Sequence, residues 1–449
     1  MNLAPLRKHL FEPILTRIAK SPKVSYWQHL EKTQWYSKSQ IEEIQWRRLQ
    51  ELWLFLWENN QFYREKFTKA GLDYNSLAVP GDIAKLPFLC KKDIRDNAID
   101  LISSGYAKDT LLHFKTGGST GKALDIFITE ECSEMRNACA RRHDRWTGWE
   151  PGEAIGAVWG NPKLPVTYRE KIRNSFVQPY IYLDTMALSA DSVRRFVSDW
   201  QKSNPTLLFG HAHSLYIFAQ QIKTLGLEAI KPAGILSTSM MLLPHERTFI
   251  EGVFGVRVTD RYGCEEVSLI GCECEQHSGV HMNIEHLVIE FIKDDGSYAE
   301  PGQPGHIVVT DLMNRAMPLV RYRVEDVGVP LDMQCSCGRG LPLMGTVTGR
   351  VADFLIKQDG TKVAGVSLIE NTLTSLPGID QLQIIQERLD HILLNIVPGK
   401  EYTPDVAHSL TDYFKGVFGT GIEVEPHLVA EIVPEKSGKY RFSICRVTA

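Results

Sequence analysis

The sequence lacks any long apolar run and any strong excess of one charge. No stretch of its 449 residues reaches the roughly 20 consecutive apolar residues that a membrane-spanning helix needs, so membrane insertion is not expected. Fifty lysines and arginines face 54 aspartates and glutamates, a net charge of −4. This balance gives no reason to expect nucleic acid or an anionic membrane as a partner. Internal repeats and low-complexity segments are also missing.

Cysteine is scarce, with nine residues in the whole chain, and a disulfide framework is therefore not expected. The cysteines are unevenly placed: Cys264, Cys272 and Cys274 lie close together, and Cys335 and Cys337 form a C-x-C pair. The first twenty residues lack the apolar core and cleavage site of a signal peptide and predict an amphipathic helix instead. A cytoplasmic location is the resulting expectation.

The length predicts two or three domains, and the apolar periodicity changes along the chain. Residues 1–75 have helical spacing, with Ser39 expected to cap one helix and Glu42 to complete a capping box. From about residue 85 strands and helices alternate, which predicts α/β layers around a mostly parallel sheet. After about residue 280 hairpins predict antiparallel β-structure.

The fold class predicted from this order is multidomain α/β. We expect a large N-terminal domain at 1–348, layered α/β/α with an antiparallel β-region, in which 1–75 form a helical scaffold. A small mobile α+β lid domain is expected at 349–449, because a hairpin, a helix, two strands, a helix and a strand follow one another there. This order is typical of ferredoxin-like domains.

The glycine-rich stretch KTGGSTGKAL, residues 115 to 124, fits three patterns. A P-loop requires G-x-x-x-x-G-K-[ST], but Thr116 stands at the first glycine position and Ala123 follows Lys122. A nucleophile elbow joins a strand to a helix, whereas apolar strand-like segments lie on both sides of Ser119. A Gly-, Ser- and Thr-rich loop between two strands still suits phosphate, because its N–H groups and hydroxyls can surround an anion. The alternative is an ordinary hairpin turn.

TGGSTGKAL resembles the phosphate loop of the adenylate-forming superfamily of acyl- and aryl-CoA ligases, and four later segments match that family in the same order. They are DRYGCEEV (260–267), MPLVRYRVEDVG (317–328), GRVADFL (349–355) and VPEKSGKYRF (433–442). The N-terminal helices, LPFLCKKDIRDN and the short C-terminal domain resemble the phenylacetate–CoA ligase and capsule-biosynthesis branch. Nearly the whole chain is covered.

The resemblance implies a set of nucleotide-site residues. The phosphate loop corresponds to Thr116, Gly117, Gly118, Ser119, Thr120, Gly121 and Lys122. Tyr262 and Gly263 would lie at the nucleotide, Glu266 would be associated with Mg²⁺, and Asp326 would bind the ribose. Arg350 would contact the ribose and phosphate side, and Lys439 would be the catalytic lysine.

Two positions depart from the family pattern. Glu265 replaces the threonine of Y-G-x-T-E, which adds negative charge near the nucleotide unless its side chain points elsewhere. Ala352 replaces the hinge aspartate, although Asp353 follows it directly.

The implied activity is ATP-dependent adenylation of a small carboxylic acid, followed by transfer to CoA, with phenylacetate-like acids as first candidates. The alternative is transfer to an amine or hydroxyl of a saccharide or natural product. A third reading, nucleotide binding without turnover, depends only on the two departures. The partners would be the acid, ATP with Mg²⁺, and CoA or another acceptor, with no nucleic acid; a homodimer is compatible with them. The acid, the acceptor and the pathway stay open.

The resemblance also gives the cysteines a role. Members of this branch carry a similar C-x₆-H…C-x-C-G-R arrangement, here Cys274, His281, Cys335 and Cys337. A Cys₃His set suits a tetrahedral structural Zn²⁺. Cys272 and His277 are competing ligands, and reduced, metal-free cysteines are the alternative.

The acyl pocket is less well specified. By resemblance, the segments that approach the substrate carry Trp159, His211, His213, Ser237, Ser239, Met240 and Tyr262. Their aromatic and apolar neighbours suggest an aryl or medium-length acyl acid. For the two histidines, a core or surface role is the simpler expectation.

Overall fold

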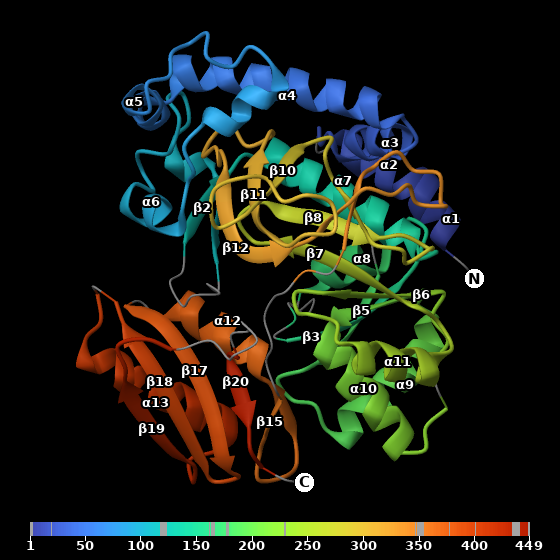
Figure 1. Cartoon of the computed structure of the whole chain (residues 1–449). Coiled ribbons are helices and arrows are strands. Elements are labelled where there is room, and N and C mark those ends of the chain that lie inside the picture. The colour runs from blue at the N-terminus through green and yellow to red at the C-terminus, as the bar shows by residue number, and fades with distance from the viewer. Residues whose placement is uncertain are drawn as a thin grey trace.

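The computed structural model describes residues 3–447 except 19, 117–123, 161, 163–166, 177–178, 229, 346, 348–353, 377, 400 and 433–440. Within these residues a nine-stranded mixed sheet forms the centre (Figure 1), in the order β13-β14-β9-β8-β7-β6-β5-β3-β4. The mixed α/β architecture confirms the predicted fold class. No helix in the described part of the chain is both long and apolar enough to cross a bilayer.

The N-terminal segment is helical, as predicted. It contains α1 (Ala4–Leu6), η1 (Arg7–Phe11), α2 (Glu12–Ile18), α3 (Lys23–Thr33), α4 (Lys38–Asn59) and α5 (Gln61–Lys69). The predicted cap of α4 was wrong by two residues. Ser37 is the N-cap, because its hydroxyl accepts from the Gln40 N–H while the Gln40 side chain accepts from the Ser37 N–H.

Short elements lead from these helices to the central sheet. They are η2 (Pro80–Lys85), α6 (Lys91–Asp96), η3 (Lys108–Thr110), the antiparallel hairpin β1 (Leu112–Lys115) and β2 (Asp125–Ile128), and α7 (Glu130–Trp146). Helix α7 packs against α3 and β8.

Alternating strands and helices build the parallel half of the sheet, as predicted. They are β3 (Ile155–Trp159), α8 (Tyr168–Phe176), β4 (Tyr180–Asp184), α9 (Ala190–Ser203), β5 (Leu207–His211), α10 (Ala212–Thr224), β6 (Gly234–Thr238), α11 (Pro244–Phe254) and β7 (Val258–Cys264). Strands β4, β3, β5, β6 and β7 pair in parallel. Their apolar runs, such as the fully buried Gly234–Thr238, are typical of strands covered on both faces.

The antiparallel half begins with β8 (Ser268–Glu273), β9 (Val280–Met282), β13 (Pro330–Leu331) and β14 (Leu343–Met344). A separate three-stranded antiparallel sheet contains β10 (Leu287–Ile292), β11 (Gly305–Asp311) and β12 (Tyr322–Gly328). The predicted change to antiparallel structure is therefore confirmed.

The C-terminal part contains β15 (Phe354–Ile356), β16 (Lys362–Ala364), α12 (Gly365–Ser375), β17 (Ile379–Arg388), β18 (His391–Pro398), α13 (Pro404–Phe418), β19 (Glu423–Leu428) and β20 (Ser443–Cys445). Its α+β elements appear in the predicted order, and its sheet lies apart from the central sheet (Figure 1). The strand order β19-β18-β17-β20 differs from a ferredoxin-like sheet, because β19 pairs directly and in parallel with β18 instead of being separated from it by another strand. The hairpin β15–β16 forms a two-stranded sheet of its own, and Lys362 of β16 makes one antiparallel bridge with Leu188. The predicted boundary near 348/349 falls outside the described residues.

Candidate functional site

Four of the predicted acyl-pocket residues lie at one edge of the central sheet. Trp159 and His211 end β3 and β5, Ser237 is near the end of β6, and Tyr262 is near the end of β7. These strands are parallel neighbours, so their carboxyl ends meet at the same edge, where open α/β sheets bind ligands. Residues from four separate segments are thereby brought together. Ser239, just past β6, has φ = 66°, a strained conformation that is common at functional sites.

Two of the predicted nucleotide-site residues are in direct contact. The Tyr262 hydroxyl on β7 donates to Asp326 Oδ2 on β12 at 2.8 Å. Gly263 follows on β7, and a Cβ there would lie 2.4 Å from the Ser268 carbonyl oxygen. Only glycine allows β7 and β8 to approach this closely. The contact joins the central sheet to the three-stranded sheet at the edge where the strands end.

Glu266 lies beside this contact and is 4% exposed. The Tyr322 hydroxyl on β12 donates to Glu266 Oε1 at 3.0 Å. Burial, and next the Glu266 carboxylate, raise the pKa of Tyr322, so its hydroxyl keeps its proton and remains a donor. The Arg136 guanidinium on α7 donates to the Glu266 carbonyl oxygen at 2.8 Å. Glu265 is exposed where Glu266 is buried, so the two carboxylates are in different environments.

Thr116 is the described end of the predicted phosphate loop. Its N–H donates to the Leu124 carbonyl at 3.0 Å, and its Oγ1 accepts from the Leu124 N–H at 2.9 Å. The loop therefore leaves β1 and returns into β2, which agrees with the strand–loop–strand context and not with a nucleophile elbow. Gly117, Gly118, Ser119, Thr120, Gly121 and Lys122 lie outside the described residues. So do Arg350, Ala352, Asp353 and Lys439.

The hairpin β15–β16 and helix α12 dock beside the same sheet edge. Leu188 and Lys362 form an antiparallel bridge with two backbone hydrogen bonds of 2.9 and 2.8 Å, and the Ala364 N–H donates to the Thr185 carbonyl at 2.8 Å. At the end of β3, a Cβ on Gly160 would lie 1.8 Å from Ser367 Oγ on α12. The first part of the C-terminal region is thus attached to the large domain by main-chain contacts.

Met240 also belongs to this interface. It is buried, and it packs in one apolar cluster with residues of the C-terminal region, among them Leu355 and Leu368.

The two histidines differ in their surroundings. His211 is fully buried, its ring lies 3.8 Å from that of Trp159, and neither ring nitrogen has a hydrogen-bond partner in the described structure. Burial lowers the pKa of His211 to about 3. His213 instead contacts the Glu246 carboxylate through Nδ1. His213 is therefore paired with a carboxylate, whereas His211 is a neutral ring buried at the strand ends.

Cys274, His281, Cys335 and Cys337 form a compact cluster. Their ligand atoms all lie within 4.8 Å of one another, with the Cys274 and Cys335 sulfurs 3.6 Å apart and Cys337 Sγ 3.4 Å from His281 Nε2. His281 Nδ1 lies 3.0 Å from the Leu341 carbonyl, to which it can donate, leaving Nε2 as the ligand atom. Burial lowers the pKa of His281 to about 4, so the ring is neutral at pH 7.

The competing ligands do not join this cluster. Within the described part of the chain, Cys272 and His277 are not among the grouped donors, and His277 Nδ1 lies 3.2 Å from Glu273 instead. Three thiols and one neutral imidazole at this spacing have the composition and compactness that a tetrahedral Zn²⁺ requires.

The cluster is tied to the N-terminal helices through Arg339. Its guanidinium lies over the rings of Trp35 and Trp146, at 4.8 and 4.7 Å from the ring centroids. Its Nε donates to Gln34 at 3.1 Å, and its NH1 donates to Glu275 at 2.9 Å. The turn that carries Cys335 and Cys337 therefore holds the connection between α3 and α4 against the central sheet.

Comparison with known proteins supports the resemblance drawn from the motifs. Residues 355–446 match the family model of the CapK C-terminal domain. Protein CapK of Staphylococcus aureus is 24% identical over 407 residues, covering 90% of this chain and 88% of that protein. Phenylacetate-coenzyme A ligase of Thermus thermophilus is 24% identical over 366 residues, covering 78% and 79%. The chain is related to the adenylate-forming ligases.

Two solved structures have the same overall fold as this chain. 2-Hydroxyisobutyryl-CoA ligase, solved with 2-HIB-AMP and CoA, matches with a TM-score of 0.61 at 18% identity, covering 91% of both chains. An open conformation of the same ligase matches with a TM-score of 0.57 and 19% identity, covering 89% of this chain and 90% of that one.

Sequence reasoning missed several residues of the candidate site. Tyr322 lies within the segment MPLVRYRVEDVG, so the motif could have revealed it. Arg136 lies on the amphipathic helix α7, where no sequence pattern distinguishes it from its neighbours. Lys91, which is buried, pairs with Glu325 at 2.7 Å, one residue before Asp326. Nothing in the spacing of residues 91 and 325 predicts that contact.

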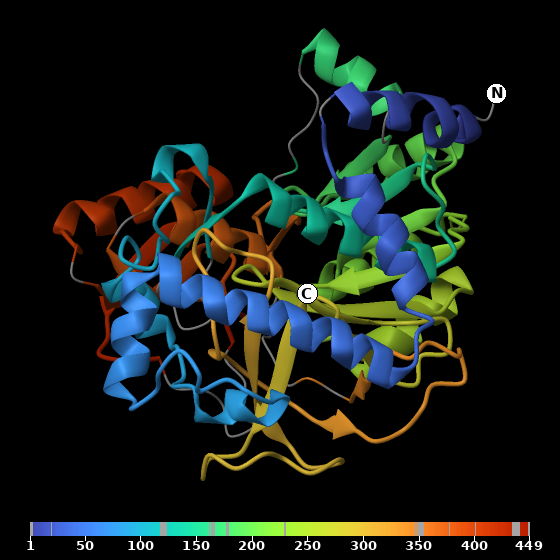
Figure 2. The same cartoon turned by 90° about the horizontal axis from the view of Figure 1, so that it is seen from above.

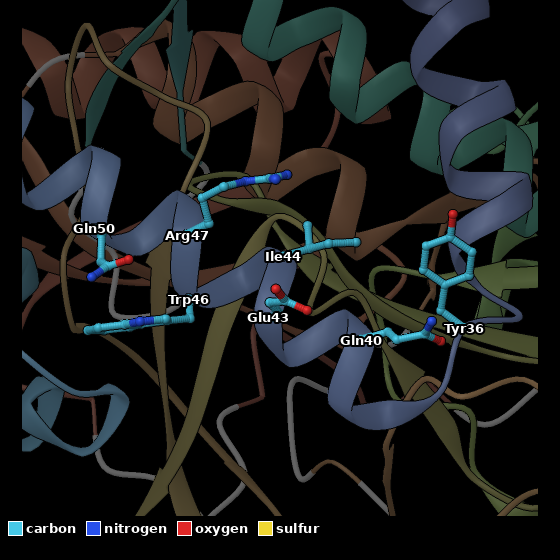
Figure 3. A pocket seen from close by; sticks show the side chains of 7 residues that line it. All are labelled: Tyr36, Gln40, Glu43, Ile44, Trp46, Arg47 and Gln50. Carbon is cyan, nitrogen blue, oxygen red and sulfur yellow. The ribbon is translucent and has the colours of Figure 1, made fainter.

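A hollow of about 370 Å³ lies along α4, away from the strand ends that form the candidate site (Figure 3). Seven side chains between Tyr36 and Gln50 line it, all from α4 and the turn before it. One helix face cannot surround a ligand, and none of these residues lies on the strands that end at the candidate site. We assign the hollow no part in the chemistry.

Proposed function

We propose that the protein is an ATP-dependent carboxylic-acid ligase that forms an acyl- or aryl-adenylate and then transfers the acyl group to CoA. The observation that carries this proposal is the meeting of two motif segments at the strand ends. There Tyr262 contacts Asp326 and Tyr322 contacts Glu266. The names of the relatives, phenylacetate-coenzyme A ligases among them, and the ligase structures with bound acyl-AMP support the same activity.

The roles of the residues follow from the chemistry. A carboxylate is a poor acyl donor because its leaving group would be oxide, and adenylation replaces this with AMP. Asp326 would accept hydrogen bonds from the ribose hydroxyls, and Tyr262 would hold its carboxylate in place. The Thr116 hydroxyl, together with the N–H groups and hydroxyls of residues 117–122, would bind the phosphates. Lys439 would bring the acid to the α-phosphate and stabilise the charge that develops there.

Glu266 would hold Mg²⁺ at the triphosphate. When bound, this cation neutralises phosphate charge. Mg²⁺ prefers carboxylate oxygens as ligands, and Tyr322 contacts only the Oε1 oxygen of the Glu266 carboxylate. Arg350 is expected on the ribose and phosphate side, and the small C-terminal domain at 349–449 is expected to move between the two half-reactions.

A structural Zn²⁺ would be held by Cys274, His281, Cys335 and Cys337. Four protein ligands leave no open position, so this metal would brace the fold and take no part in catalysis. A cytoplasmic location and a homodimeric state also stay predictions.

Pyrophosphate exchange across a panel of acids tests the first half-reaction. Exchange with ATP and one acid, starting with phenylacetate and other aryl acids, is the expected result, and no exchange with any acid would contradict the proposal. Adding CoA should then give a thioester. If adenylate forms but thioester does not, the acceptor is an amine or hydroxyl instead.

A further inference from the structure

The N-terminal helices expose an apolar stripe. Elements α1, η1 and α2 run on from residue 4 to residue 18, and Leu6, Leu10, Ile14 and Ile18 recur at intervals of four. Their exposed fractions lie between 43% and 73%, and Leu15 beside them is exposed as well. Residues at this spacing share one helix face. A stripe of this kind normally packs against a core, whereas this one faces solvent.

Helix α8 exposes a second stripe at the same corner of the molecule. Tyr168, Ile172 and Phe176 are also four residues apart, with Tyr168 81% exposed. The Phe11 and Phe176 rings meet edge to face, 5.6 Å between centroids, which joins the two helices. Figure 2 shows the dark blue N-terminal helices and the green α8 together at one corner, away from the C-terminal sheet. We call the exposed members the N-terminal patch: Leu6, Leu10, Ile14, Leu15, Ile18, Tyr168, Ile172 and Phe176.

Polar contacts hold the first helix on the body of the protein. Arg7 donates to the Gly152 carbonyl at 3.1 Å, Lys8 pairs with Glu150 at 2.9 Å, and Glu12 pairs with Arg141. The helix is therefore fixed by its polar side, and the apolar stripe is left on the outside.

The charge around the patch is opposite to that of the chain. Residues 1–23 contain five lysines and arginines and one glutamate, a net charge of +4. The whole chain carries −4. The balanced total, which argued against an anionic partner, therefore conceals a local excess of positive charge. Arg17 and Lys20, both exposed, lie at the end of the stripe.

We propose that the N-terminal patch docks the protein on the surface of an anionic lipid bilayer. Helices that carry large apolar residues on one face and lysine or arginine beside it lie in the interface, with the apolar face among the acyl chains and the cations at the headgroups. A second copy of this chain is a poorer occupant. A two-fold contact would set the same patch against itself and bring two basic surfaces together.

Sedimentation of the full-length protein with vesicles tests the proposal. Vesicles of equal parts phosphatidylglycerol and phosphatidylcholine should bind the protein, and vesicles of phosphatidylcholine alone should bind it much less. Leu10→Asn with Ile14→Asn should weaken binding to the acidic vesicles by at least about tenfold, because two inserted side chains are lost. Arg17→Gln should weaken it by about fivefold.

Leu428→Asn is the matched control, because Leu428 is at least as exposed as Leu10 and Ile14 but lies on β19 in the C-terminal sheet. It should bind vesicles like the wild type. All these positions are exposed, so the melting temperature should change little, and adenylation of a soluble acid without vesicles should be unaffected. The test is therefore independent of the proposed activity.

Absence of binding to acidic vesicles, or equal binding to both vesicle types, would overturn the proposal. A wild-type dimer in light scattering that becomes monomeric in the Leu10→Asn, Ile14→Asn variant, without any vesicle binding, would assign the patch to a second copy instead.

Discussion

Tyr322→Phe probes how Glu266 is held at the strand ends. The change removes one hydroxyl, which donates to Glu266 Oε1 at 3.0 Å, and keeps the buried ring. A hydrogen bond to a buried charged group contributes about 1.5–3 kcal/mol. At about 1.4 kcal/mol for each factor of ten, kcat/KM for adenylation should fall by roughly 10- to 100-fold. The loss should be greatest at low Mg²⁺, because a less ordered carboxylate holds the cation more weakly.

The assay is pyrophosphate exchange over a range of Mg²⁺ concentrations, with the acid that gives the strongest exchange. Tyr298→Phe is the matched control, since Tyr298 also donates to a carboxylate, Glu290 Oε1 at 2.6 Å, away from the strand ends. It should leave exchange unchanged. If Tyr322 acts only through Glu266, adding Tyr322→Phe to Glu266→Gln should cause no further loss. Wild-type exchange and wild-type Mg²⁺ dependence in Tyr322→Phe would refute the reasoning.

Three other outcomes are expected. Lys439→Ala should abolish pyrophosphate exchange while ATP binding, measured by calorimetry, stays close to wild type; normal exchange would remove this lysine from the mechanism. Protein purified without chelator should contain about one equivalent of zinc, and Cys337→Ser should lose it and melt at a lower temperature; less than about a tenth of an equivalent in the wild type would reject the metal site. Burial lowers the pKa of His211 to about 3 from the 6.5 of an exposed histidine. The unfolded chain therefore binds an extra proton on going from about pH 7 to about pH 5, which costs the fold about 2 kcal/mol. His211→Phe should flatten the fall in melting temperature over this range, and an unchanged slope would mean that the ring is not buried as described.

The periodicity of the chain predicted most of the fold, because helices and buried strands leave local patterns. The alternation after residue 85 predicted the parallel sheet, because short apolar runs between helices are typical of strands that are covered on both faces. Ser37 and Ser39 show where local reasoning fails. Both serines lie at the start of the same helix, and the choice of cap depends on whether the side chain of Gln40 or of Glu42, three residues on, reaches back.

Strand partners could not be predicted in the same way. The C-terminal elements occur in the expected order, yet β16 pairs with Leu188 of the large domain, and β19 lies directly beside β18. Which edge a strand joins depends on surfaces that are distant in sequence. The same is true of the candidate site. The motifs predicted that Glu266 and Asp326 belong to one site. The hydrogen bonds from Tyr322 and Arg136 to Glu266 could not be predicted, because only the folded chain brings these residues together.

The bridge between Leu188 and Lys362 consists of main-chain groups, as does the bond from Ala364 to Thr185. Substitution of a side chain leaves such bonds in place. In the proposed ligase, the residues that border the strand ends could therefore differ among relatives, changing the space for the acid, while the C-terminal hairpin stays attached. The backbone would maintain the attachment, and the side chains would set the preference for one acid over another.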